Sequence, residues 1–311
     1  MRLGKLMGSV SSVAVVVAGA QQASAETQSM LSGYKLNVQG GVGVSDGVWN
    51  DKFEASSGSS GPFDKIGAEE GIPAYMGSVA LSRQTSPNKD MAFGLSFGVS
   101  DGDGFSFSSS FSGSGSSGSG TLTFAGGEGL SFAALDFEMG TTVPTGMADL
   151  RWFYGARALA SKSTLSEEFD KVGSSGSGSA SFEFESVFLG VGPRVGVGFS
   201  TQPAPGSQFG FSGEVGAAYL FGTRTETFTS SYSSGGSSSS YSSSYSERKN
   251  VTSLDAQVGV DYYLSDNATI SAGYQLQQFW NIDSVSDEDA SFDGSGPRLV
   301  HGVFVGFTTQ F

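Results

Sequence analysis

The sequence predicts an all-β fold, an antiparallel transmembrane β-barrel of about ten strands with short turns at one end and long loops at the other. Three observations lead to this prediction: an N-terminal export signal, a two-residue alternation of apolar and polar residues in many segments, and connections that alternate between short and long. Together these features are typical of barrels in the outer membrane of Gram-negative bacteria.

The first 25 residues have the composition of a signal peptide. A basic start at Arg2 and Lys5 precedes an apolar run over residues 6–20, and a small-residue triplet ends at Ala25. The alternative, a membrane anchor, is disfavoured because the run is shorter than the roughly 20 apolar residues that span a bilayer. We therefore expect cleavage after Ala25 and a mature barrel over residues 26–311.

Composition narrows the class of protein further. The chain has a formal net charge of −14, which argues against nucleic-acid binding, and no cysteine, which excludes thiol catalysis and disulfides. Its 47 glycines suggest disorder, but its 25 phenylalanines need an apolar environment. Because no second apolar stretch is long enough for a spanning helix, any membrane insertion must use strands.

Alternation marks each strand in turn. Between Tyr34 and Val44, for example, every second residue is apolar or glycine, and the residues between them are polar or glycine. We expect ten such strands, at residues 34–44, 73–83, 91–101, 130–141, 148–160, 182–199, 208–224, 251–264, 268–281 and 298–311. In the sixth, Phe188 and Val191 differ in parity, which predicts a bulge near residues 190–193, where Gly and Pro occur.

The connections between these strands are of two kinds. Short ones at residues 84–90, 142–147, 201–207 and 265–267 alternate with long ones at 45–72, 102–129, 161–181, 225–250 and 282–297. This order predicts periplasmic turns, extracellular loops and both termini in the periplasm. Low-complexity Ser/Gly stretches at 108–120, 173–181 and 230–246 fall in the long loops, and are expected to be mobile or to continue a hairpin beyond the membrane.

A soluble β-sandwich also hides one face of each strand and is the main alternative fold. Two features oppose it. The face opposite the apolar one is dominated by Gly, Ser and a few charges, and aromatic residues gather near strand ends, as in membrane-interface girdles. These aromatic residues are Tyr34, Tyr75, Trp152, Tyr154, Tyr219, Phe221, Tyr262 and Tyr274.

The last predicted strand carries a terminal signal. Apolar residues alternate along it up to Phe307 and Phe311, and the chain stops on that aromatic residue. This ending resembles the C-terminal signal that outer-membrane proteins present to the barrel-assembly machinery. We therefore expect that machinery and periplasmic chaperones as partners in transit, and outer-membrane lipid and lipopolysaccharide as the final surroundings.

Residues of the opposite parity should face the lumen. The candidates for lining a pore are Lys35, Asp136, Glu138, Arg151, Arg157, Glu214, Asp255, Asp261 and Arg298, together with the uncharged Asn37, Gln39, Gln257, Gln275 and Gln277. Both signs of charge are present, so these side chains either line a narrow water-filled pore or cross-link a plugged interior. Barrels of about eight strands are filled and those of about sixteen hold channels, which leaves ten strands nearer the filled case.

Catalytic and metal sites have little support. The single histidine, His301, is expected to face lipid near the outer interface, out of reach of the rim carboxylates. The Asp-Gly-Asp-Gly stretch at residues 101–104 is expected to be a solvated loop. The acidic residues of 283–293 lack EF-hand spacing; they predict a solvated tip or, alternatively, a bridge through divalent cations to lipopolysaccharide phosphates. We expect no enzyme activity, cofactor or resident metal.

Three motifs carry a resemblance to a known family. Residues 151–157 read Arg-Trp-Phe-Tyr-Gly-Ala-Arg, residues 190–196 read Gly-Val-Gly-Pro-Arg-Val-Gly, and residues 297–306 contain His301-Gly-Val-Phe-Val-Gly306. These motifs resemble signatures of the Legionella-type major outer-membrane protein family. The resemblance, over roughly residues 150–311, implies a pore-forming outer-membrane barrel with Arg157 and Arg194 in its wall or lumen.

Two functions remain open from the sequence. The first is a narrow porin-like channel for small hydrophilic solutes or ions, preferring cations because acidic loops concentrate positive ions. The second is a non-conducting structural or adhesive surface barrel that acts through its Ser-rich extracellular loops.

Overall fold

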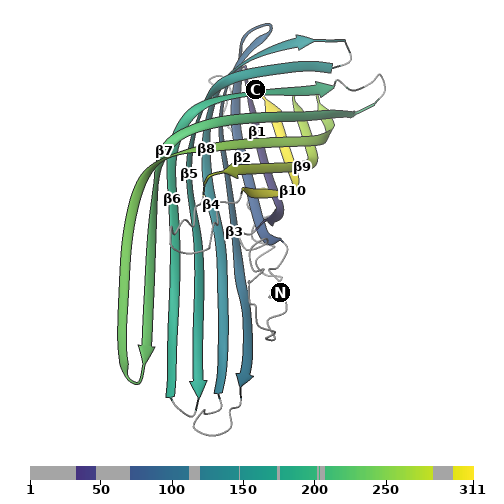
Figure 1. Ribbon diagram of the computed structural model, residues 1–311. Coiled ribbons are helices and arrows are strands. Elements are labelled where there is room, and N and C mark those ends of the chain that lie inside the picture. The colour runs from purple at the N-terminus through teal and green to yellow at the C-terminus, as the bar shows by residue number, and fades with distance from the viewer. Residues whose placement is uncertain are drawn as a thin grey trace, which may run out of the picture.

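The computed structural model describes residues 33–46, 71–111, 120–146, 148–173, 176–201, 203, 207–282 and 297–311, which form a closed ring of ten antiparallel strands (Figure 1). Their bounds are β1 Tyr34–Ser45, β2 Ile72–Ser86, β3 Lys89–Phe111, β4 Gly120–Pro144, β5 Ala148–Gly173, β6 Gly176–Thr201, β7 Phe209–Ser234, β8 Ser237–Ser265, β9 Ala268–Trp280 and β10 Arg298–Gln310. In these residues no helix is long and apolar enough to cross a membrane. The predicted all-β, ten-stranded fold is confirmed.

Each strand pairs with its sequence neighbours, and the first and last strands close the ring. β1 and β10 pair from Lys35 with Gln310 to Ser45 with Val300. The strand ends that the four predicted short turns connect lie at one end of the ring, together with the last residue, Phe311, whose N–H donates to the carbonyl of Tyr34. Closure leaves no unpaired edge in the ring, as a structure in hydrocarbon requires.

Six strands are far longer than predicted. A membrane-spanning strand needs about 9–11 residues, whereas β3 has 23 and β4 to β8 have 25 to 29. Much of the predicted loops 102–129, 161–181 and 225–250 is therefore strand, because their alternating Ser, Thr and aromatic residues favour hairpins that run on past the barrel (Figure 1). Of the two options for the low-complexity stretches, the hairpin is correct for 176–181 and 230–246.

These continued strands form an open sheet that we call the extension: residues 101–111, 120–129, 164–173, 176–185 and 225–250. β3 pairs with β2 only up to Ser100, and β8 pairs with β9 only from Thr252. Within the described residues the extension therefore contains β3 to β8 but not β1, β2, β9 or β10. It projects from the end of the barrel opposite the chain's C-terminus (Figure 1).

The outer face of the barrel is apolar. Phe93, Leu95 and Phe97 of β3 and Val303 and Val305 of β10 are among many large apolar side chains that point outward and stay exposed. Aromatic side chains gather at its two ends, with Trp152 and Tyr154 near the short turns and Tyr219 and Phe221 toward the extension. Lipid tails supply the apolar contact that these side chains need.

The predicted bulge in β6 is wrong. Its pairing with β7 keeps one register from Gly190 with Gly222 to Arg194 with Ala218, and its pairing with β5 is unbroken. The change of parity has another cause: Phe188 points into the barrel and is 1% exposed, while Val191 points out to lipid. The lumen itself therefore contains apolar side chains, which the sequence analysis assigned only to the outer face.

Candidate functional site

A cavity of about 660 Å³ occupies the half of the lumen nearest the short turns. Its lining runs from Gly33, Gln84 and Gln310 at the mouth to Arg157 and Arg194 in its depth. The diameter of a barrel grows with its strand number, and the side chains of about eight strands just fill the interior. A ring of ten strands with small residues on part of its inner face therefore leaves some of the lumen open. The charged residues in the lining are seven carboxylates, Asp90, Asp136, Glu138, Asp149, Glu214, Asp255 and Asp261, and four cationic side chains, Lys35, Arg151, Arg157 and Arg194.

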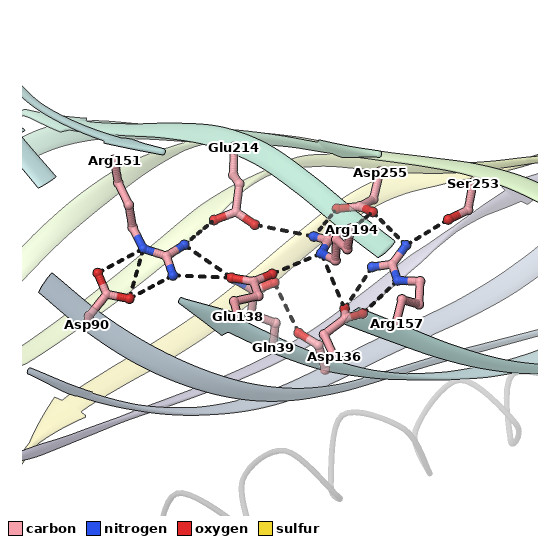
Figure 2. A network of polar contacts seen from close by, with 11 residues as sticks. Gln39, Asp90, Asp136, Glu138, Arg151, Arg157, Arg194, Glu214, Ser253 and Asp255 are labelled. Atoms are coloured by element: carbon pink, nitrogen blue, oxygen red, sulfur yellow. Dashed lines mark hydrogen bonds and ion pairs between the residues drawn. The ribbon is translucent and has the colours of Figure 1, made fainter. Parts of the chain in front are cut away.

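Arg157 and Arg194 hold the inner end of the cavity together across the lumen (Figure 2). Arg157 of β5 donates from Nε and Nη2 to the two carboxylate oxygens of Asp136, both at 2.7 Å, and from Nη1 to Asp255 Oδ1 at 2.7 Å. Arg194 of β6 donates to both oxygens of Asp255, at 2.5 and 2.8 Å. Bidentate pairing of an arginine with a carboxylate fixes the orientation of both partners.

The network continues toward the mouth through Glu138. Arg194 Nε donates to Glu138 Oε1 at 2.9 Å, and Arg151 Nη1 donates to Glu138 Oε2 at 3.2 Å (Figure 2). Arg151 also pairs with Asp90 at 2.8 Å, and Glu214 lies 3.8 Å from both arginines. Since these five carboxylates outnumber the three arginines, the network has a formal charge of 3 − 5 = −2.

The aromatic ring of Phe153 lies against the guanidinium groups of two of these arginines. Its ring centroid is 4.8 Å from the guanidinium carbon of Arg151 and 5.2 Å from that of Arg194. Cations over an aromatic face are attracted by its negative centre, more so when water is excluded. The same ring therefore positions both guanidinium groups.

Glycines on β6 and β7 make room for these large side chains. A Cβ added at Gly196 would lie 2.2 Å from Phe153 Cζ, and one at Gly216 would lie 2.5 Å from Arg194 Nη2. Both distances are too short for real contacts, so any other residue would displace the ring or the guanidinium group. The glycines on the inward-facing side of the strands therefore leave space that side chains from neighbouring strands fill.

An apolar layer fills the lumen on the side of the network that faces the extension. Nearly every strand contributes to it, and none of its members is more than 6% exposed. Phe132 and Phe279 meet across the lumen with ring centroids 5.0 Å apart. The layer consists of Ala74, Met76, Leu130, Phe132, Ala134, Leu159, Phe188, Ala218, Leu220, Val251, Phe279, Ile282 and Val300.

Beyond the layer, two buried arginines lie at the base of the extension. Arg298 pairs with Glu128 and donates from Nη2 to Ser163 Oγ at 3.0 Å. Arg224 pairs with Glu226 and Glu247. From the short turns outward, the lumen therefore contains a polar cavity, the charged network, the apolar layer and a second set of ion pairs.

The predicted lumen residues all point inward but do not share one site. Eight of the nine charged candidates line the cavity, whereas Arg298 lies across the apolar layer from them; the eight are Lys35, Asp136, Glu138, Arg151, Arg157, Glu214, Asp255 and Asp261. The charged candidate set omitted Asp90 and Asp149, whereas Arg194 was expected in the wall or lumen only through the family resemblance. The aromatic residues of the layer were also not predicted to face the lumen. Parity was a usable signal for both groups, because these side chains share the parity of the lumenal glycines.

Two other predicted residues lie away from the cavity. His301 is on the outer face, where Nδ1 contacts the hydroxyl of Tyr274, but its Nε2 lies 4.0 Å from Asp46 Oδ1. The expectation that it reaches no rim carboxylate is therefore wrong, because the chain past the end of β1 stays beside β10, where Asp46 N–H donates to the carbonyl of Leu299. Phe307 pairs in register with Val38 on the wall of β1. The signal peptide and the acidic residues of 283–293 lie outside the described residues.

Metal ligands do not gather anywhere in the described part of the chain: no group of three or more His, Cys, Asp or Glu is arranged to hold an ion there. The carboxylates of the cavity instead face arginines, which compete for the same oxygen atoms. The chemistry that this lumen offers is thus recognition by charge and hydrogen bonds.

Comparisons with known proteins identify one family and several distant folds. A sequence model described as the Legionella pneumophila major outer membrane protein precursor matches residues 88–310. Among curated proteins none matches. Solved structures with a similar trace include the outer membrane protease OmpT from Escherichia coli, with 10% identity, a TM-score of 0.44, and coverage of 89% of this chain and 96% of that one.

Two further structures are similar at the same distant level. The translocator domain of the autotransporter NalP from Neisseria meningitidis has 11% identity and a TM-score of 0.34, with coverage of 97% of this chain and 98% of that one. A major outer membrane protein from Thermus thermophilus has 13% identity and a TM-score of 0.33, with coverage of 89% and 99%. Scores this low carry no argument about activity.

Proposed function

The chain belongs to the family of the Legionella pneumophila major outer membrane protein and is a bacterial outer-membrane β-barrel, and from this premise we propose that it forms a narrow, cation-preferring channel for small hydrophilic solutes. The observation that carries the proposal is the polar cavity of about 660 Å³, whose volume lies within the range of cavities that bind small molecules. Its lining has three more carboxylates than cationic side chains. An excess of one sign of charge in a low-dielectric cleft concentrates ions of the opposite sign.

We propose that the apolar layer holds this channel closed. Water and ions do not cross a constriction of packed apolar side chains, and channels use such constrictions to stop conduction. Every member of the layer is buried, so passage requires side chains such as Phe188 and Phe279 to move aside. The charged network, on the side of the constriction nearest the short turns, then selects which ions pass.

Single-channel recording of the refolded chain without residues 1–25 tests the proposal. We expect brief cation-selective openings in a salt gradient, and longer openings in the variant Phe188→Ala/Phe279→Ala, which removes two rings from the layer. Asp261→Asn should reduce cation selectivity without breaking an arginine pair, since Asp261 accepts from Ser271 Oγ rather than from an arginine in the network. Silence from both the folded parent and the double variant would reject the channel and favour a barrel that acts only through its surface.

We also propose that Phe307 and Phe311 form the signal for assembly into the membrane. Phe311 is held at the periplasmic end by backbone hydrogen bonds with Gly33 and Tyr34, so the signal joins the closing strand pair. Deleting Phe311 should lower the amount of folded barrel in cells while refolding in detergent stays unchanged. An unchanged amount in cells would remove this role.

A further inference from the structure

The tip of the β7–β8 hairpin has an unusual composition for this protein. Residues 227–246 contain no charged side chain, although the chain as a whole has a net charge of −14. The 20 residues are Ser, Thr, Gly, one Phe and three Tyr. The tip can therefore contact a partner only through hydroxyl groups, backbone groups and aromatic rings.

The turn of the hairpin fixes which side chains share a face. Gly235 and Gly236 both have positive φ, 60° and 85°, as a two-residue hairpin turn requires. The resulting register pairs Tyr232 with Ser239 and Tyr241 with Ser230. Paired residues of antiparallel strands point the same way, so the register sets the arrangement before any partner arrives.

All three tyrosines lie on one face, which we call the tyrosine face: Tyr232, Tyr241 and Tyr245. Their exposed fractions are 57%, 62% and 64%, so the rings are available to a partner. Nearer the barrel, Phe228 on the same face stacks on Phe182 of β6 at a centroid distance of 6.2 Å, which ties the hairpin to its neighbour. Exposed aromatic groups on a soluble surface mark interaction sites.

The opposite face of the hairpin consists of hydroxyl groups that pair with one another. Thr225 Oγ1 lies 2.9 Å from Ser246 Oγ, Thr227 donates to Ser244 at 3.4 Å, and Thr229 lies 3.3 Å from Ser242. This ladder joins β7 to β8 on the face turned away from the tyrosines.

The tyrosine face is too far from the bilayer to be an aromatic girdle. From Val251 of the apolar layer, Tyr245 lies 6 residues along β8, Tyr241 lies 10, and Tyr232 lies opposite Ser239 at 12. At about 3.3 Å per residue these separations are roughly 20, 33 and 40 Å along the strand. Membrane-interface aromatics lie at headgroup level instead. The partner must therefore be reached in the medium outside the membrane.

We propose that the tyrosine face binds an uncharged glycan. Sugar rings offer C–H faces that pack on aromatic rings and hydroxyls that exchange hydrogen bonds with Tyr and Ser, each of which can donate and accept. A phosphorylated or sulfated partner would call for Arg or Lys, and residues 227–246 have neither. Protein interfaces centre on Trp, Tyr or Arg side chains in desolvated pockets, and the open sheet to which the hairpin belongs provides no such pocket at the tyrosine face.

Binding of the full mature chain in detergent to a printed panel of oligosaccharides tests this proposal, which does not depend on whether the lumen conducts. The panel contains neutral, sialylated and sulfated members. We expect the parent to retain neutral members. The variant Tyr232→Ser/Tyr241→Ser/Tyr245→Ser should bind them at least about tenfold more weakly, since each lost ring contact contributes a fraction of that factor. The matched control is Thr225→Ala/Thr227→Ala/Thr229→Ala on the opposite face, which should bind as the parent does.

Heat-dependent gel migration confirms that each variant is a folded barrel before binding is measured. Failure to retain any neutral member would overturn the proposal. Equal binding by the parent and the tyrosine variant would also overturn it, as would preference for sulfated or sialylated members. An equal loss in both variants would show that the hairpin's strand pairing rather than its tyrosine face is responsible, and would reject the assigned surface.

Discussion

Strands β5 to β8 each run through the barrel and the extension, and their inward-facing side chains differ in burial between the two regions. Within the barrel their inward side chains are buried: Arg157, Arg194, Phe188 and Leu220 are all 3% exposed or less. In the extension the same faces of the same strands carry residues such as Tyr232 that are mostly exposed. The alternation of side chains is continuous along each strand; what differs is the opposite wall, which ring closure supplies to the barrel and the open extension lacks.

This comparison shows that burial in a small barrel depends on side chains from across the ring. Phe132 of β4 meets Phe279 of β9, although these strands are not neighbours in the sheet. A fully buried side chain of this size contributes roughly 1.5–3 kcal/mol. Stability should therefore be concentrated in the lumen, and the extension should tolerate changes that the barrel does not.

The largest expected effect comes from removing a lumenal arginine. Arg194→Ala leaves Asp255 and Glu138 buried without one of their cationic partners, and should lower the free energy of unfolding by about 3–5 kcal/mol. Arg248→Ala, at an exposed position of β8, should change it by less than about 0.5 kcal/mol. Urea titration of the barrel in lipid measures both; similar values would contradict the contrast between the regions.

Removing an apolar side chain from the layer should cost somewhat less. Leu220→Ala creates a cavity at a position with no exposed surface and should destabilise the barrel by about 3 kcal/mol. Tyr232→Ala deletes a larger side chain in the extension, yet should change stability by under about 0.5 kcal/mol because the ring is already in water. The same titration distinguishes them, and an equal loss would mean that the extension is packed like the lumen.

Adding a methyl group tests the glycine positions. Gly196→Ala pushes against Phe153 and should cost about 1–3 kcal/mol through overpacking. Gly94→Ala faces the open cavity, where the nearest atom to the new Cβ is 3.8 Å away, and should stay within about 0.5 kcal/mol of the parent. A large loss at Gly94 would show that the cavity is smaller than described.

The smallest effect is expected from the hydroxyl ladder. Thr227→Ala/Ser244→Ala removes one exposed cross-strand hydrogen bond and should change global stability by less than about 0.5 kcal/mol. Hydrogen exchange should nevertheless speed up locally in the hairpin, because its strands open independently of the ring. A loss of global stability above that level would indicate that the extension and the barrel unfold together.

By itself the sequence determined the strand number, the four short turns and the outward apolar face. A two-residue period indicates a strand with one apolar face, and Gly, Pro and Asn between such segments indicate turns, so both features depend on local conformation alone. It also indicated most of the charged lumenal residues through their parity. It did not predict the length of β3 to β8, since Ser-rich alternation is compatible with either a mobile loop or an exposed hairpin.

Only the tertiary structure decided what the lumenal side chains do. Phe188 on the glycine parity of β6 suggested a bulge from sequence, but the ring places that side chain in the apolar layer. Whether Arg157 reaches Asp136 or Asp255 depends on register and tilt summed around ten strands, which no single segment encodes. Contacts across a barrel are set by its closure, whereas alternation along a strand states only which face each residue takes.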